Sequence, residues 1–245
     1  MITPPRRLCI VETLNPGASW LGKVETLARG WGAALELCAA DVEHFISASW
    51  ATQSGAGEYR AALAARRRED LARLVQPLRA RGVDAVTGTL LPAPLERSVM
   101  AHVVSTRPGL VIKSTQHAPI VPVAALLQTD WMLAHALSAP LLLLGGEPWP
   151  SAPVVAVMSE HGSDPDRELM ATARQVCAAL AGTLETVPAR WSDASHLTGD
   201  LHGCGASLVA MSYAALHTVD AAARILDEVE ADLLIAPQAA NPRDP

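Results

Sequence analysis

Residues 109–114 read GLVIKS, and residues 207–212 read SLVAMS. Both stretches are short, aliphatic and end in serine, which is typical of a strand that is buried on both faces of a parallel sheet. A second pair of stretches follows them, because residues 139–143 read APLLL and residues 231–235 read ADLLI. The chain therefore contains an internal repeat, and each copy predicts the later strands of one α/β unit.

The first half of the chain alternates strand and helix signals around the first copy. Aliphatic runs bounded by polar or glycine residues predict strands, and apolar residues at helical spacing predict helices. Five strands alternating with four helices predict a parallel sheet with right-handed crossovers. The expected strands are 8–12, 33–40, 83–90, 109–113 and 141–144, and the expected helices are 19–31, 59–81, 95–104 and 130–137.

The second half restarts the pattern after a stretch rich in proline and glycine. We expect a first domain over residues 1–146, a linker over 147–153 and a second domain over 154–245. The second copy is shorter and lacks one helix–strand unit. Its expected strands are 154–158, 184–187, 208–211 and 233–236, and its expected helices are 164–180 and 219–229. Whether 184–187 is the second or the third strand of its repeat is left open.

Composition and charge exclude several classes of protein. Half of the 245 residues are apolar and 18% are charged, so a large core can form, and the formal net charge of −6 argues against nucleic acid as a partner. The chain has no run of 18 apolar residues, and the opening MITPPRR is not followed by an apolar stretch. We therefore expect a cytoplasmic protein. In that reducing compartment the four scattered cysteines are interpreted as small buried hydrophobic residues.

Four stretches carry a resemblance to a known family. Residues 8–12 read LCIVE, 109–115 read GLVIKST, 128–131 read QTDW and 138–144 read SAPLLLL. In this order they resemble the tandem, E-type universal stress proteins. The resemblance covers nearly the whole chain, although in the second half only 207–212 and 231–236 carry it.

The resemblance implies an α/β fold built from two tandem Rossmann-like units of the adenine nucleotide α hydrolase-like type. Each unit would have an open parallel sheet, and the second would be reduced and degenerate. The two units would pack across 141–144 and 233–236 as an intramolecular pseudo-dimer, and a homodimer is left open. Ligands of this family lie at the carboxyl edges of the strands, which is also where a doubly wound sheet forms its crevice.

The nucleotide motif of the family is degenerate in the first unit. Members that bind ATP carry an acidic residue at the end of the first strand and Gly-x-x-Gly, nine residues and Gly-Ser/Thr after the fourth. Glu12 matches the acidic residue, but Ser114 and His117 replace the first two glycines, and Leu127 and Gln128 replace the final pair. A Cβ at these positions blocks close approach of a phosphate.

The second unit departs further from the motif. Ser212 and Ala215 stand at the two glycines, Met158 stands where the acidic residue belongs, and the loop is too short for the nine-residue spacing. We therefore expect no cofactor and no ordinary ATP binding, although ATP or another small molecule is left open as a ligand.

Other patterns are given ordinary interpretations. Gly55-Ala56-Gly57 lacks the further glycine of a dinucleotide loop, and the arginine-rich stretch 60–81 is expected to be a solvated helix face. His196, Asp200, His202 and Cys204 match no zinc spacing and are assigned to a glycine-rich loop, so no metal site is expected.

The sequence thus predicts a non-enzymatic binding or regulatory protein of the universal stress type, with no catalytic residue. Its partner is an unknown protein or a small molecule, and the first unit is expected to hold the ligand pocket. The candidate ligand-binding residues are Glu12, Ser114, Thr115, His117 and Thr129. A nucleotide-binding protein with weak ATP hydrolase activity and a purely structural interaction module are the alternatives.

Overall fold

The structure is a computed structural model, and it describes most of the residues of the chain. These are residues 4–12, 18–40, 56–83, 86–92, 95–114, 133–134, 136–145, 148–160, 167–189, 194–212 and 228–237.

The first part of the chain forms the strands and helices that its aliphatic runs predict. They are β1 (Arg7–Glu12), α1 (Ala18–Trp31), β2 (Ala34–Ala40), α3 (Ala56–Ala80), β3 (Thr87–Leu91), α4 (Leu95–Thr106), β4 (Leu110–Ser114) and β5 (Leu141–Leu144). Of the helix expected over 130–137, the structure describes residues 133, 134, 136 and 137; the first three are helical and Leu137 is not.

Two glycines end helices where the sequence predicts. Gly32 and Gly82 follow α1 and α3 with φ of 59° and 80°, in the left-handed region that glycine adopts without a steric penalty. The strand expected over 83–90 begins later, at Thr87. Val83 and Val86 are buried in the connection, and Val86 offers its carbonyl to the Arg79 guanidinium at 2.6 Å instead of to a neighbouring strand.

The second part contains β6 (Val154–Glu160), α6 (Arg167–Ala179), β7 (Thr183–Ala189), α7 (Ala194–Gly203), β8 (Ala206–Ser212) and β9 (Asp232–Ala236). The assignment of 196–204 to a loop is wrong. Thr198 and Leu201 are buried at a spacing of three, so packing of one helix face overrides the low helix propensity of Gly199 and Gly203. The helix expected over 219–229 lies outside the described residues, apart from its end.

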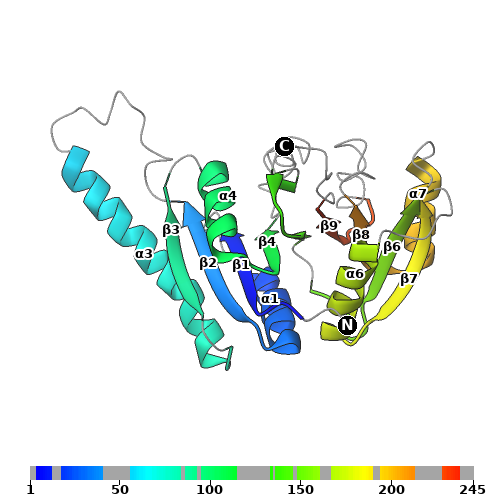
Figure 1. Ribbon diagram of the computed structural model, residues 1–245. Coiled ribbons are helices and arrows are strands. Elements are labelled where there is room, and N and C mark those ends of the chain that lie inside the picture. The colour runs from blue at the N-terminus through cyan, green and yellow to red at the C-terminus, as the bar shows by residue number, and fades with distance from the viewer. Residues whose placement is uncertain are drawn as a thin grey trace.

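The strands form a nine-stranded sheet in the order β3-β2-β1-β4-β5-β9-β8-β6-β7. Figure 1 shows that the first part of the chain fills one half of this sheet and the second part the other. All neighbours are parallel except β5 and β9, which pair antiparallel with Leu142 opposite Leu234. The predicted pairing of the strands 141–144 and 233–236 is therefore present.

The open question about 184–187 is answered by the pairing of β7. It runs parallel to β6 from Val154↔Thr183 to Glu160↔Ala189, as β2 runs parallel to β1. It is therefore the counterpart of the second strand, and among the described residues no strand lies beyond it as β3 lies beyond β2.

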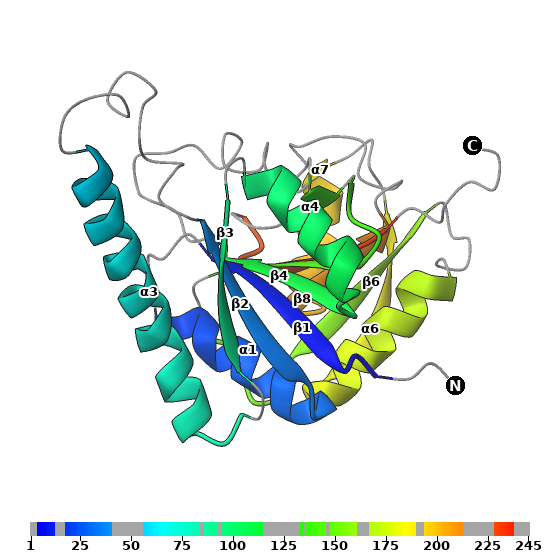
Figure 2. The same ribbon diagram turned by 60° about the vertical axis from the view of Figure 1, so that its left-hand side comes forward.

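Helices cover both faces of the sheet (Figure 2). Trp20, Leu78 and Val176 bring α1, α3 and α6 into the core of one face. Val103 and Leu201 bring α4 and α7 into the core of the other. No helix in the described part of the chain has both the length and the apolar character that crossing a membrane requires.

The helices α1 and α6 meet closely at one glycine. A Cβ added to Gly30 would lie 2.6 Å from the carbonyl oxygen of Ala179, which belongs to the α6 backbone and has little freedom to move. At Gly22, eight residues earlier in α1, an added Cβ would have no neighbour within 4 Å. The first glycine is therefore required by packing between the two halves, and the second is not.

We predict opposite effects of alanine at these positions. Gly30→Ala should lower the free energy of unfolding by about 1–3 kcal/mol, because it overpacks the contact between α1 and α6. Gly22→Ala should raise it by roughly 0.5–1 kcal/mol, because alanine is the better residue inside a helix. Urea denaturation of both variants measures the difference, and shifts of the same sign would contradict the described packing.

Candidate functional site

The predicted site lies at the carboxyl ends of β1 and β4. These strands are neighbours, with Leu8 opposite Leu110 and Val11 opposite Lys113, so Glu12 and Ser114 are the next residues on each strand and end at the same edge. The sheet extends from β1 through β2 in one direction and from β4 through β5 in the other. This reversal is the topological switch point at which open α/β sheets form a crevice.

The structure describes part of the predicted residue set. Ser114 is half-buried at the end of β4 and pairs with Leu144 of β5. The backbone of Glu12 is described, but its side chain is not. Thr115, His117 and Thr129 lie outside the described residues. The structure thus brings Glu12 and Ser114 together at one edge, and the ligand-binding roles of all five residues remain predictions.

The strand register in the second half shows that the sequence analysis aligned the wrong residue with Glu12. Val155 lies opposite Leu208 as Leu8 lies opposite Leu110, so the counterpart of Glu12 is Ser159 and not Met158. Met158 is buried and takes the place of Val11. The conclusion drawn from the sequence is unchanged, because the residue at this position is still not acidic.

A buried ion pair that the sequence analysis missed joins the two halves. Lys23 of α1 donates to both carboxylate oxygens of Asp232 at the start of β9, at 2.8 and 2.9 Å. The main-chain N–H of Gly145 also donates to Asp232 Oδ1, at 2.6 Å, and the Trp149 ring lies 5.3 Å from Lys23 Nζ. Lys23 and Asp232 are 5% and 1% exposed, so neither charge is shared with solvent.

Burial of the ion pair affects the pKa of its carboxyl group. Burial raises the pKa of Asp232, while the charge and hydrogen bond of Lys23 act in the opposite direction. A buried carboxylate without its cation is strongly disfavoured, so each charge depends on the other. Two features of the sequence could have indicated this pair. Lys23 lies among the apolar residues Trp20, Val24 and Leu27 of α1, and Asp232 is the first residue of an otherwise apolar strand.

Two buried thiols form a second cluster with an imidazole. Cys9 Sγ and Cys38 Sγ are 3.7 Å apart, and one ring nitrogen of His102 on α4 completes a set whose atoms all lie within 4.8 Å of one another. Burial of Cys9, Cys38 and Cys177 confirms the prediction from sequence, whereas Cys204 is half-buried. Asp200, His202 and Cys204, the described members of the cluster around α7, form no such group.

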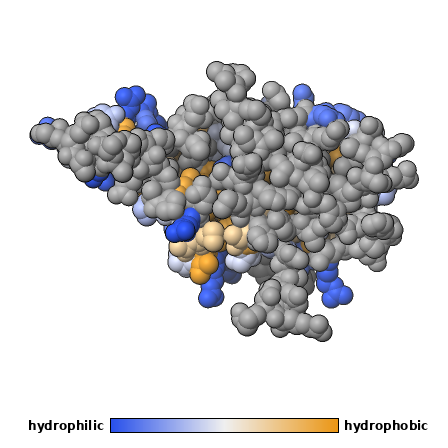
Figure 3. Space-filling model, turned by 90° about the horizontal axis from the view of Figure 1, so that it is seen from above, coloured by the Kyte–Doolittle hydropathy of each residue, from blue (hydrophilic) through white to orange (hydrophobic). Residues whose placement is uncertain are grey.

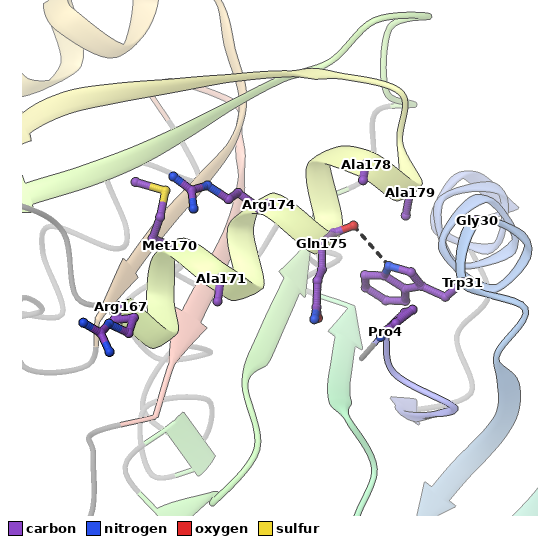
Figure 4. Close-up of a pocket in the computed structure, with 10 residues that line it drawn as sticks. All are labelled: Pro4, Gly30, Trp31, Arg167, Met170, Ala171, Arg174, Gln175, Ala178 and Ala179. Carbon is purple, nitrogen blue, oxygen red and sulfur yellow. Dashed lines mark hydrogen bonds between the residues drawn. The ribbon is translucent and has the colours of Figure 1, made fainter. Parts of the chain in front are cut away.

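A groove of about 720 Å³ lies between α1 and α6 (Figure 4). Trp31 forms one side and donates its indole N–H to the carbonyl oxygen of Gln175 at 3.1 Å, while Met170, Arg167 and Arg174 come from α6. Trp31 ends α1 just before β2 begins, so the groove is at the amino ends of the strands. It is therefore separate from the predicted crevice.

The described surface is largely hydrophilic when the molecule is seen from above, with a small apolar group (Figure 3). Among the described residues, the exposed large hydrophobic side chains are Tyr59, Met100 and Val104. Tyr59 lies on α3, whereas Met100 and Val104 are four residues apart on α4 and form one small exposed apolar group. A group of this size is ordinary on a protein surface and defines no partner surface. The arginine-rich helix α3 is solvated as predicted, because Arg66, Arg68 and Arg73 are exposed.

Comparison with solved structures identifies the class of fold. A candidate universal stress protein from Pseudomonas aeruginosa UCBPP-PA14 matches with a TM-score of 0.65 and 17% identity over 96% of this chain and 94% of its own. A universal stress protein from Archaeoglobus fulgidus DSM 4304 matches with a TM-score of 0.65 and 8% identity over 96% and 99%. A protein of unknown function from P. aeruginosa PAO1 matches with a TM-score of 0.67 and 15% identity over 96% and 93%.

These likenesses confirm the predicted fold. The chain has the α/β, Rossmann-like fold of universal stress proteins, with a mostly parallel open sheet. No protein-family model and no curated protein sequence matches the chain.

We predict that Lys23→Met lowers the free energy of unfolding by about 3–5 kcal/mol at pH 7, because the buried Asp232 carboxyl must then either stay charged without a cation or take up a proton. The loss should shrink toward pH 4. Without Lys23 the pKa of Asp232 in the folded state rises further. In the unfolded state Asp232 has its ordinary pKa of 3.8, so above this pH the unfolded chain releases a proton that the folded chain keeps. Stability of the variant therefore falls as the pH rises from there.

Arg29→Met is the matched control, because Arg29 lies on the same helix and pairs with Glu25 at 2.8 Å but is 52% exposed. Its effect should stay below about 1 kcal/mol. Urea denaturation between pH 4 and pH 7 measures both variants. A deficit of Lys23→Met that does not change with pH would count against a buried, charged Asp232.

Proposed function

We propose that the protein is a non-enzymatic binding or regulatory protein of the universal stress type. It consists of one α/β unit over residues 1–146 and a reduced unit over 154–245, joined by the linker 147–153. The fold shared with universal stress proteins over 96% of the chain supports this proposal. The antiparallel pairing of β5 with β9 supports packing of the two units through their last strands.

The binding site of this proposal is the crevice of the first unit. The observation that carries it is the meeting of Glu12 and Ser114 at the switch point between β1 and β4. Thr115, His117 and Thr129 would supply further hydrogen-bonding groups from the adjoining segments. Such an edge suits a small molecule with polar groups that face the strand ends.

The ligand is proposed not to be ATP. Ser114 has a Cβ where the nucleotide motif has glycine, at the point where main-chain N–H groups would have to approach a phosphate. A cytoplasmic location is part of the proposal, and it rests on the sequence analysis.

We predict that Mg-ATP does not change the melting temperature and is not hydrolysed. A site of ordinary affinity would behave differently, since a ligand at 100 times its Kd stabilises the folded state by about 2.7 kcal/mol. Differential scanning fluorimetry and phosphate release measure the two properties. A rise in melting temperature that Glu12→Ala abolishes would overturn the prediction and establish a nucleotide site, provided that Glu185→Ala, at an exposed carboxylate on β7, retains it.

Native mass spectrometry of the freshly purified protein tests for the proposed ligand. We expect a bound non-nucleotide molecule whose occupancy falls in Ser114→Leu, because the larger side chain fills the edge of the crevice. Ser212→Leu is the matched control, since Ser212 ends β8 as Ser114 ends β4. Equal occupancy in both variants would overturn the site. A ligand-free mass would favour a protein-interaction module.

A further inference from the structure

Two cysteines on neighbouring strands face α4 from the same side of the sheet. Cys9 lies opposite Glu36 in the pairing of β1 with β2, and Cys38 lies opposite Val11. The two cysteines are thus diagonal neighbours, each fully buried, with 3.7 Å between their sulfur atoms. Because they are 29 positions apart in the chain, no local sequence motif predicts that they lie together.

This diagonal relation disfavours a disulfide. Cα atoms of diagonal neighbours in a sheet are about 7–8 Å apart. A disulfide requires roughly 4.4–6.8 Å, so bonding of the two sulfurs would demand movement of the backbone. The two thiols are therefore close together, but they cannot form a disulfide without movement of the backbone.

The same separation suits two ligands of one metal ion. A tetrahedral Zn²⁺ about 2.3 Å from each of two thiolates holds the sulfurs about 3.8 Å apart, close to the 3.7 Å seen between Cys9 and Cys38. His102, which projects from α4 onto these strands, offers the third ligand atom within 4.8 Å. Thiolate and imidazole together favour zinc over magnesium or calcium.

The imidazole is not otherwise satisfied. His102 Nε2 is buried and lies 3.0 Å from Glu36 Oε2, close enough for an ion pair with a protonated ring. The contact is not aligned as a hydrogen bond, and within the described residues this nitrogen has no other partner. Thr89 donates to the other oxygen, Glu36 Oε1, at 2.9 Å and holds the carboxylate beside the ring.

We propose that Cys9, Cys38 and His102 bind Zn²⁺ between the sheet and α4, with the Glu36 carboxylate, 3.0 Å from the imidazole, as an outer partner of the site. Binding converts two thiols to thiolates and releases two protons, so two thiolates, one carboxylate, a neutral imidazole and Zn²⁺ leave one negative charge. Because binding releases protons, the apparent affinity for Zn²⁺ rises with pH. The ion would link α4 to β1 and β2, because its three ligands come from these elements.

The test uses the full chain without an affinity tag, stripped of metal by chelation under a phosphine reductant. Zn²⁺ affinity is measured by competition with a chromophoric chelator, and Co²⁺ serves as the spectroscopic probe. We expect one Co²⁺ per chain, with thiolate-to-cobalt charge transfer in the near ultraviolet and the visible bands of a tetrahedral ion.

Variants assign the ligands. Loss of an outer partner lowers metal affinity by about 10–100-fold. Cys9→Ser, Cys38→Ser and His102→Gln each remove a direct ligand and should lower Zn²⁺ affinity by more than that. Glu36→Gln should lower it by at least about tenfold. Cys177→Ser is the matched control, because Cys177 is also a buried thiol but lies on α6 against the other face of the sheet. It should leave affinity and spectrum unchanged.

Absence of the charge-transfer band, or its persistence in both Cys9→Ser and Cys38→Ser, would overturn the proposal. If the cysteine variants fail to fold, His102→Gln decides, since this side chain is 16% exposed and no described residue hydrogen-bonds its Nε2. Unchanged Zn²⁺ affinity and an unchanged Co²⁺ spectrum in that variant would also overturn the site.

Discussion

The buried ion pair between Lys23 and Asp232 is the constraint on which the arrangement of the two halves depends. Asp232 opens β9 at 1% exposure, and its charge is tolerated because Lys23 of α1 and the N–H of Gly145 satisfy both oxygens. The pair therefore connects a helix of the first half, the end of β5 and the first residue of β9. At this seam an otherwise parallel sheet becomes antiparallel, and α1 is placed beside α6.

The candidate sites depend on this seam to different degrees. The crevice at Glu12 and Ser114 and the cluster of Cys9 and Cys38 are built from β1, β2 and β4, so the first half alone positions their described residues. The groove beside Trp31 needs both α1 and α6 and exists only where the halves meet. The proposed binding of a ligand at the strand edge and the proposed binding of a metal beneath α4 can therefore be tested separately.

The sequence predicts the elements that have a strong local signal, but it does not predict a glycine-containing helix or the side-chain pairs that form only in the folded sheet. Aliphatic runs predicted the strands because both faces of this sheet are covered. The helix α7 was missed because Gly199 and Gly203 obscure the burial of Leu201. Of the candidate site, the meeting of Glu12 and Ser114 follows from parallel strand order. The partnership of Cys9 with Cys38 requires the register, and that of Lys23 with Asp232 joins residues 209 positions apart.

Native-state hydrogen exchange in increasing urea tests most directly whether the seam makes the two halves one cooperative unit. The amides to follow are those of β5 and β9 at the seam and those of β1 and β8 inside each half. We expect all four strands to lose protection in one transition with a common urea dependence, and the seam would then make the halves one unit. This expectation would be contradicted if β5 and β9 exchanged at low urea while β1 and β8 stayed protected, or if the two halves opened in separate transitions.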